Sequence, residues 1–511
     1  MIRKINTIVF KGIEGIKIEI QIQISKAIPS FVIVGLADKT IAESKERVRS
    51  AISSLGLSMP SKKITVNLSP ANILKEGSHF DLAIASALLA SMDILPQAEI
   101  SEYLILGELS LDSSILKVRG VLPAAIEANA INLGIICPFD NKNEAAWSNN
   151  PNIVAAKDLL QLINHFKGAQ IISPPVLKRK KKNKIKSDFK EIKGQYTAKR
   201  ALEIAAAGNH NLIMFGPPGT GKSMLAQRMV SILPELDAKE ILESSIISSI
   251  TGNLQEEYLV EDRPFRSPHH NCTQAAMVGG GSGYNMHPGE VTLAHNGILF
   301  LDEFPEFNYQ VIESLRQPIE DKQVLIARSG NQIRYPSKFQ LVAAMNPCRC
   351  GYLNDPQKAC SKAPLCAQTY QAKISGPIID RFDIRTEVGE EDFNLFENSE
   401  EKEQEYFSSE KMLERISKAR ELQKLRYEKY NIETNCEANA DILKKFINLD
   451  KETKNLLSNA HKKFRFSVRS YLSILKVSRT IADLENSQTI NKIHMSEAMR
   501  FRNVQITNSI K

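Results

Sequence analysis

One short glycine-rich segment has the residue types and the spacing of a phosphate-binding loop. Its eight residues are Gly216, Pro217, Pro218, Gly219, Thr220, Gly221, Lys222 and Ser223, which match the pattern G-x-x-x-x-G-K-S. Glycines let the backbone curl until several N–H groups point at phosphate oxygens. The charge of Lys222 suits the β- and γ-phosphates, and the hydroxyl of Ser223 suits Mg²⁺. The segment therefore predicts a site for a nucleoside triphosphate and its Mg²⁺ ion.

Two acidic residues farther along the chain are candidates for the hydrolytic step. Residues 298–301 are all apolar, as in a buried parallel strand, and Asp302 and Glu303 follow directly. Ligands bind at the carboxyl edge of such a sheet. We therefore predict that Asp302 holds Mg²⁺ through water and that Glu303 polarises the attacking water. Pairs of acidic residues after a strand are common by chance. The catalytic interpretation of this pair depends on the phosphate loop that precedes it in the chain.

Three further residues could complete the site. A predicted strand at 340–344 ends just before Asn346, whose amide could orient the attacking water. Arg381 opens the segment that leaves the nucleotide-binding region, and Arg469 lies at the start of a predicted helix. An arginine that reaches the γ-phosphate from a neighbouring subunit stabilises the charge of the transition state. A lone arginine otherwise indicates a surface salt bridge, so these two gain weight only from a family resemblance.

Four of the seven cysteines lie close together in the sequence, in a predicted loop after the strand that ends before Asn346. They are Cys348, Cys350, Cys360 and Cys366. Four thiolates suit a tetrahedral Zn²⁺ ion, although the spacing departs from the usual pairs of cysteines. The alternative is a group of unligated or transiently oxidised thiols. The remaining cysteines, Cys137, Cys272 and Cys436, are expected to be core or surface residues.

The elements that must position these residues divide the chain into parts. Residues 191–390 are predicted to form an α/β nucleotide-binding core, with a strand at 212–215 before the phosphate loop and a helix at 224–233 after it. Residues 1–170 also alternate strand and helix patterns. A linker at 171–190 contains the basic run KRKKKNKIK, which is either solvated or grips phosphates. An acidic connector and helices, one of them at 467–484, fill 391–511.

Composition limits the class of protein. The 511 residues are 42% hydrophobic and 24% charged, with a net charge of +8, as in a multidomain globular protein. No apolar run approaches the roughly 20 residues that span a bilayer. The sequence predicts no membrane segment and a cytoplasmic location, and the few cysteines suit a reducing compartment. The positive charge is compatible with a nucleic-acid partner but does not establish one.

Two other segments have a possible role in contacts. Residues 322–336 read as a β-hairpin, and residues 279–283 are rich in glycine. The basic residues of this hairpin could contact a polyanion, so we predict DNA contacts near Lys322, Arg328 and Arg334. An ordinary hairpin at a subunit interface is an equal alternative. His269 and His270 are assigned to an interface rather than a metal, because no carboxylate is evident beside them.

The order of these motifs resembles the magnesium-chelatase-like group of AAA+ ATPases, and within it the ComM/YifB proteins, over essentially the full length. Short sequences throughout the chain carry the resemblance. They are FVIVGLAD at 31–38, ESKERVR at 43–49, ITVNLSP at 64–70, RPFRSPHH at 263–270, GGGS at 279–282, LAHNG at 293–297, LRQPIED at 315–321 and RTIADL at 479–484. Together these motifs are highly specific.

The resemblance implies an architecture and a function. It implies an α/β phosphate-loop AAA+ core with a C-terminal helical lid, preceded by a Lon-protease-like (ribosomal protein S5-like) domain. It also implies that Asn346 is sensor 1, Arg381 the arginine finger and Arg469 sensor 2. The expected function is an ATP-dependent homo-hexamer that unwinds DNA and drives branch migration during natural transformation. The alternative is a chelatase-like ATPase that remodels a protein partner or inserts Mg²⁺ into a tetrapyrrole.

A protease is the third candidate, because Lon proteases use a serine–lysine pair. In residues 75–81 the nucleophile position falls on His79, and in residues 107–123 the lysine position falls on Pro123. Without a nucleophile and a base, acyl transfer has no mechanism. Only Ser78, one position away, could restore a nucleophile. The N-terminal domain is therefore predicted to be a scaffold without proteolytic activity.

Overall fold

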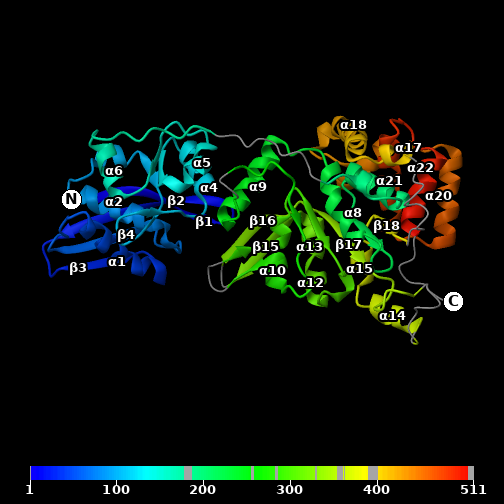
Figure 1. The fold of residues 1–511 in the computed structure, drawn as a ribbon, viewed down its shortest axis with the longest axis horizontal. Coiled ribbons are helices and arrows are strands. Elements are labelled where there is room, and N and C mark those ends of the chain that lie inside the picture. Colours follow the sequence, from blue (N-terminus) through cyan, green and yellow to red (C-terminus); the bar gives the residue numbers. More distant parts are fainter. Residues whose placement is uncertain are drawn as a thin grey trace.

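The computed structural model describes residues 2–177, 187–254, 258–281, 286–328, 331–353, 361, 363–389 and 401–503. The N-terminal α/β domain lies at one end of an elongated molecule, a second α/β unit lies in the middle, and the C-terminal helices lie at the other end (Figure 1). The basic run at 178–186 and residues 390–400 of the acidic connector lie outside the described residues. No helix in the described ranges combines the length and apolarity needed to cross a membrane.

The N-terminal domain is built on a seven-stranded mixed sheet in the order β3-β4-β2-β1-β5-β8-β9. Strands β1 and β4 flank β2 and run antiparallel to it, whereas β3 pairs in parallel with β4. The strands are β1 (Ile2–Lys11), β2 (Glu14–Ser25), β3 (Ser30–Val34), β4 (Lys63–Ser69), β5 (Tyr103–Ile105), β8 (Gly134–Pro138) and β9 (Ile153–Ala156). The strand patterns predicted within residues 1–170 are thus confirmed.

Helices complete this domain. They are α1 (Lys39–Ser54), α2 (Asp81–Ser91), α4 (Val121–Ala130), α5 (Lys142–Ala146) and α6 (Leu159–Phe166). Ten of the eleven residues of α2 are buried, which explains its lack of an amphipathic pattern. The buried carboxylate of Asp81 at its start pairs with Arg47 of α1, with 2.6 Å between Oδ2 and Nε.

The middle unit contains a five-stranded parallel sheet in the order β11-β14-β17-β10-β18. The strands are β10 (Leu212–Phe215), β11 (Phe265–Arg266), β14 (Ile298–Leu301), β17 (Gln340–Met345) and β18 (Ile384–Glu387). Every residue of β10, β14 and β17 is buried, as expected for a parallel sheet covered on both faces. The predicted α/β class of this unit is confirmed.

The helices around this sheet set the position of the loops at its carboxyl edge. They are α7 (Tyr196–Gly208), α8 (Lys222–Arg228), α9 (Ala238–Thr251), α12 (Tyr309–Ser314), α13 (Arg316–Asp321), α14 (Leu365–Gln371) and α15 (Gly376–Ile379). The helix predicted at 224–233 in fact begins at Lys222 and continues after Arg228 as a 3₁₀ turn from Met229 to Ile232. The predicted boundary was wrong because Gly221, with φ 84°, already turns the chain into the helix.

The C-terminal helices pack on the same sheet unit. They are α17 (Glu401–Tyr406), α18 (Ser409–Tyr427), α19 (Ala440–Phe446), α20 (Lys451–Phe464), α21 (Val468–Leu484) and α22 (Lys492–Asn503). Ile204 of α7, Ile416 of α18 and Ile481 of α21 share one hydrophobic core. The helix predicted at 467–484 is confirmed, and the hydroxyl of Ser467 caps it by accepting a hydrogen bond from the amide of Ser470 at 3.1 Å.

Among the described residues, two regions of contact join the N-terminal domain to the middle unit. In the first, helix α4 packs on α9, and the hydroxyl of Ser249 in α9 donates to the carboxylate of Glu144 in α5 at 2.5 Å. The second contact involves the predicted hairpin, which forms as β15 (Gln323–Arg328) and β16 (Asn331–Pro336). A Cβ added to Gly12 would come within 2.8 Å of Ile333, so the hairpin packs against the turn between β1 and β2. Figure 1 shows the hairpin beside that end of the N-terminal sheet.

Candidate nucleotide site

The phosphate loop joins β10 to α8 at the carboxyl edge of the sheet. Gly219 and Gly221 have φ values of 82° and 84°, which favour glycine, and a Cβ at Gly216 would come 1.9 Å from the carbonyl oxygen of Val388. The ammonium of Lys222 donates to the carbonyl oxygens of Gly216 and Pro217 at 2.8 and 2.6 Å. Burial lowers the pKa of Lys222. The lysine is therefore held inside the curl of the loop.

The acid pair lies directly beside this loop. The hydroxyl of Ser223 donates to Oδ2 of Asp302 at 2.6 Å, so the first turn of α8 meets the end of β14. A hydroxyl and a carboxylate at this separation are the oxygen ligands that Mg²⁺ prefers. The residues predicted to bind the ion thus lie together, and they fit it chemically.

Glu303 has an unusual backbone. Its φ is 49°, in the left-handed region, and its amide donates to Oδ1 of Asp302 at 2.9 Å. Residues held in this region cluster at functional sites. Oε2 of Glu303 lies 3.2 Å from Nδ1 of His270, and the glutamate side chain is 55% exposed. Its carboxylate is therefore accessible from outside the chain, unlike the buried strand that precedes it.

Strand β17 places Asn346 between the two parts of the site. It pairs with β10 on one side and with β14 on the other, in a register that aligns Met345 with Phe215. Because carboxyl ends of parallel strands share an edge, Asn346 follows β17 between the phosphate loop and the acids. The topology thus agrees with the predicted role without testing it.

The two predicted arginines meet at one carboxylate for which the sequence predicted no role. An Nη of Arg381 lies 2.7 Å from Oε1 of Glu320 in α13, and an Nη of Arg469 lies 2.8 Å from the same oxygen. Arg381 is buried, whereas the side chain of Arg469 is 45% exposed. Partial burial raises the pKa of Glu320, but the hydrogen bond from Arg469 and the two positive charges outweigh it, so this pKa lies below its usual value.

Arg381 is also constrained from the C-terminal helices. Desolvation and the nearby charge of Arg469 lower the pKa of Arg381, and its Nε has no hydrogen-bond partner among the described residues. Its neighbour Asp380 accepts a hydrogen bond from Arg502 of α22 at 3.0 Å. Arg502 also donates to the hydroxyl of Ser470 at 2.8 Å. The segment that carries Arg381 is thereby tied to both α21 and α22.

Three of the four clustered cysteines come together next to the site. The sulfurs of Cys348, Cys350 and Cys366 all lie within 4.8 Å of one another, and the first two are 3.0 Å apart. Cys360 lies outside the described residues, so the predicted set of four is not tested as a whole. The side chain of Arg328 and part of the glycine-rich loop at 279–283 are likewise outside.

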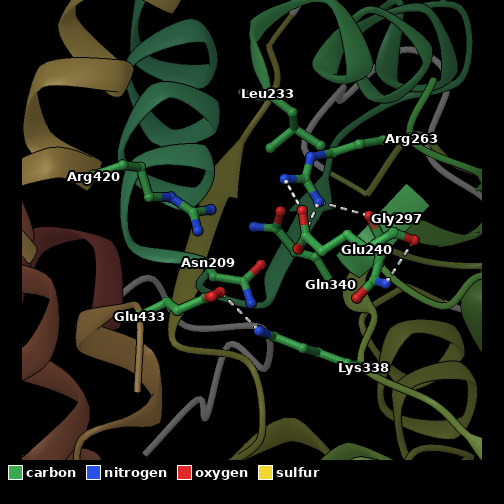
Figure 2. A pocket seen from close by; sticks show the side chains of 10 residues that line it. Asn209, Leu233, Glu240, Arg263, Gly297, Lys338, Gln340, Arg420 and Glu433 are labelled. Carbon is green, nitrogen blue, oxygen red and sulfur yellow. Dashed lines mark hydrogen bonds and ion pairs between the residues drawn. The ribbon is translucent and has the colours of Figure 1, made fainter. Parts of the chain in front are cut away.

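A separate small pocket lies at the opposite edge of the sheet. Its volume is about 30 Å³, and Asn209, Gly297 and Gln340, which precede or begin β10, β14 and β17, line it. In Figure 2 Arg263 and Glu240 point toward each other, and Lys338 meets Glu433, at 3.1 and 3.0 Å. This pocket is at the amino ends of the strands, so it is a contact between the sheet unit and the C-terminal part and not the phosphate site.

Comparison with known proteins agrees with this geometry. Three family models that describe the magnesium chelatase subunit ChlI match the chain: one at residues 20–141, one at 188–395 and one, for the C-terminal part of ChlI, at 407–502. The chain is 38% identical to the competence protein ComM of Haemophilus influenzae, over 96% of this chain and 95% of that protein. The chain belongs to the ComM/YifB family of magnesium-chelatase-like proteins.

Other relatives extend the comparison. The uncharacterised protein YifB of Escherichia coli is also 38% identical, over 96% of this chain and 95% of its own length. A more distant likeness links the chain to the DNA replication licensing factor Mcm6 of Drosophila melanogaster, 22% identical over 63% of this chain and 38% of that protein. The predicted membership of the ComM/YifB family is thus confirmed.

One premise from the sequence is corrected. The assignment of His269 and His270 to an interface rests on the absence of a carboxylate beside them, yet the structure places Glu303 next to His270. The reason is that β11 (Phe265–Arg266) pairs in parallel with β14. His270, which follows β11, is thereby brought beside Glu303, which follows β14. Nothing in the sequence separation of these residues indicated the contact. The interface itself stays a prediction.

The residues predicted to stand at the positions of a protease pair have other partners. The ring of His79 forms a hydrogen bond with the carbonyl of Ile8 at 3.0 Å, and Pro123 is buried in α4. The hydroxyl of Ser78 donates to the carboxylate of Glu108. A serine–lysine mechanism needs an amine to accept the serine proton, and this contact of Ser78 is with a carboxylate instead.

Proposed function

We propose that this family member is an ATPase that hydrolyses Mg²⁺-ATP and uses the energy to move on DNA. The observation that carries the proposal is the contact of Ser223 with Asp302 beside the loop that holds Lys222. Lys222 and the amides of residues 216–223 bind the phosphates, and Ser223 and Asp302 hold the metal ion. Glu303 polarises the attacking water, and Asn346 orients it. Zn²⁺ takes no part in these steps.

A homo-hexameric ring is part of the proposal. In the described parts of the chain, the hydrogen bonds of Arg381 and Arg469 go to Glu320 and Pro377 and not to the phosphate loop. Arginines that do not contact the phosphate loop of their own subunit can contact the nucleotide bound at the loop of a neighbouring subunit. Contacts of this head-to-tail kind form a ring when the rotation from one subunit to the next closes on itself. Arg381 then acts as the finger and Arg469 as sensor 2, and Glu320 holds both until the neighbour binds ATP.

Three observations support DNA as the partner. The relative from Haemophilus influenzae is named a competence protein, Mcm6 is named a DNA replication factor, and this chain has a net charge of +8. We propose a helicase that drives branch migration and so aids the integration of incoming DNA during natural transformation. Lys322, Arg328 and Arg334 of the hairpin are the proposed contacts.

The remaining assignments complete this proposal. Residues 1–170 form a Lon-protease-like scaffold without protease activity, 171–190 a basic linker, 191–390 the AAA+ core, and 391–511 the connector and helical lid. The second candidate function is a chelatase-like ATPase that remodels a protein partner, favoured by the matches to ChlI.

DNA stimulation separates these two functions. We expect single-stranded, forked or four-way DNA to raise the rate of ATP hydrolysis, and rising salt to reduce this effect because phosphate contacts release counterions. The measurement is steady-state ATPase activity and strand displacement across a salt series. A rate that is the same with and without every DNA structure would favour the protein-remodelling function.

Lys222→Ala should abolish nucleotide binding, because it removes the charge that faces the β- and γ-phosphates. Binding of a fluorescent ATP analogue measures this directly. The control is Lys239→Ala, since Lys239 lies exposed on α9 away from the loop. Retained affinity in the Lys222 variant, with a folded circular dichroism spectrum, would contradict the assignment of the site.

A further inference from the structure

The three gathered thiols have the geometry of a metal site rather than of a covalent bridge. Cys348 and Cys350 lie in the turn after β17, and Cys366 lies in α14, so two elements supply the sulfurs. The separation of 3.0 Å between the first two sulfurs is well beyond the roughly 2.05 Å of a disulfide. Around a tetrahedral Zn²⁺ with Zn–S distances near 2.3 Å, thiolates lie about 3.8 Å apart. A small adjustment therefore suffices.

The turn that carries these thiols rests on the phosphate loop. The amide of Gly351 donates to the carbonyl of Cys348 at 3.0 Å and closes the turn. Gly351 has a φ of 86°, and a Cβ there would come 2.5 Å from Cδ of Pro218. The side-chain amide of Gln371, near the end of α14, donates to the carbonyl of Pro347 at 2.7 Å. Anything that fixes α14 to the turn therefore also fixes the surface that Pro218 packs against.

We propose that Cys348, Cys350 and Cys366 bind one Zn²⁺ ion, and that this ion holds the turn against Pro218 and so sets the affinity of the loop for ATP. Soft thiolates select zinc over Mg²⁺, which prefers oxygen ligands, so this ion is distinct from the one that accompanies ATP. Water or a further side chain completes the tetrahedron. Binding releases the thiol protons and involves no change of oxidation state.

The metal content of purified protein tests the site itself. With Zn²⁺ in the growth medium, wild-type protein should retain about one zinc per chain, and Cys366→Ser should retain less than about a tenth of that. Cys272→Ser is the control. Because Cys272 lies outside the cluster, this variant should keep its zinc. Co²⁺ alone, added to metal-free protein, should give thiolate-to-cobalt absorption in the near ultraviolet. Zinc-free wild-type protein that also fails to bind Co²⁺, or intact-mass evidence of a disulfide, would overturn the proposal.

The coupling to ATP needs a variant that keeps all the thiols. Gly351→Ala should retain zinc but raise the dissociation constant of a fluorescent ATP analogue by about tenfold, as should removal of zinc by a chelator. If the affinity for ATP is unchanged both in Gly351→Ala and in zinc-free protein, zinc does not set the affinity of the loop. The zinc site itself would still be tested by the metal content. The coupling between zinc and ATP affinity rests on the proposed nucleotide site. A failure of that site would give a different result, because the protein would then bind no ATP with or without zinc.

Discussion

Glu303→Gln should produce a protein that binds ATP and then stalls. The amide has nearly the same shape as the carboxylate but cannot polarise water as a base, so the turnover number should fall by about 10²–10⁴-fold. The affinity for ATP should change little, because the proposed phosphate contacts come from Lys222 and the loop amides and not from Glu303. Single-turnover hydrolysis and binding of a fluorescent ATP analogue measure the two quantities separately.

A neighbouring acid provides the matched control for this experiment. Glu306 lies three residues further on and pairs with Lys373 at 3.0 Å, outside the contact between Asp302 and Ser223. Glu306→Gln should therefore keep nearly normal turnover. If Glu303→Gln hydrolyses ATP as fast as the Glu306 variant, Glu303 is not the residue that activates water.

Arg381→Ala should lose hydrolysis while it keeps ATP binding. An arginine that reaches the γ-phosphate from a neighbouring subunit contributes about 10³–10⁵-fold to the rate. Because the proposed contact lies between subunits, the lost activity should return when a partner supplies the arginine. Steady-state ATPase assays on mixtures of two inactive variants test this, with the ring checked by mass photometry.

The partner for the mixture is Lys222→Ala, which keeps its own Arg381 but binds no ATP. In a randomly mixed ring, about a quarter of the interfaces would combine an intact loop with an intact arginine, and activity should recover to a corresponding fraction. Wild-type protein mixed with either variant controls for subunit exchange. Absence of recovery in rings that demonstrably exchange subunits would show that Arg381 serves its own loop.

Much of the site follows from local sequence. The loop at 216–223, the strand before the acids and the strand before Asn346 each have a residue pattern that specifies their structure within a few positions. The parallel order of β14, β17 and β10 then brings their ends together without further information. This is why Ser223 and Asp302 were predicted together although they are far apart in the chain.

The parts that escaped prediction depend on contacts between distant segments. Glu320 lies in the motif LRQPIED at 315–321, but only the tertiary fold, which brings Arg381 and Arg469 to it from other parts of the chain, makes it their common partner. The contact of His270 with Glu303 and that of Gly351 with Pro218 have the same origin. No periodicity or spacing encodes such pairs, because each is created by the tertiary fold.

Arg502 joins Asp380 to Ser470, so α22 and α21 are both fixed to the segment that carries Arg381. If Arg381 serves the nucleotide of a neighbouring subunit, as proposed, a displacement of α22 changes the position of that arginine as well. Shortening or tagging the chain close to Arg502 should then interfere with the contact between subunits, even where each subunit remains folded and binds ATP.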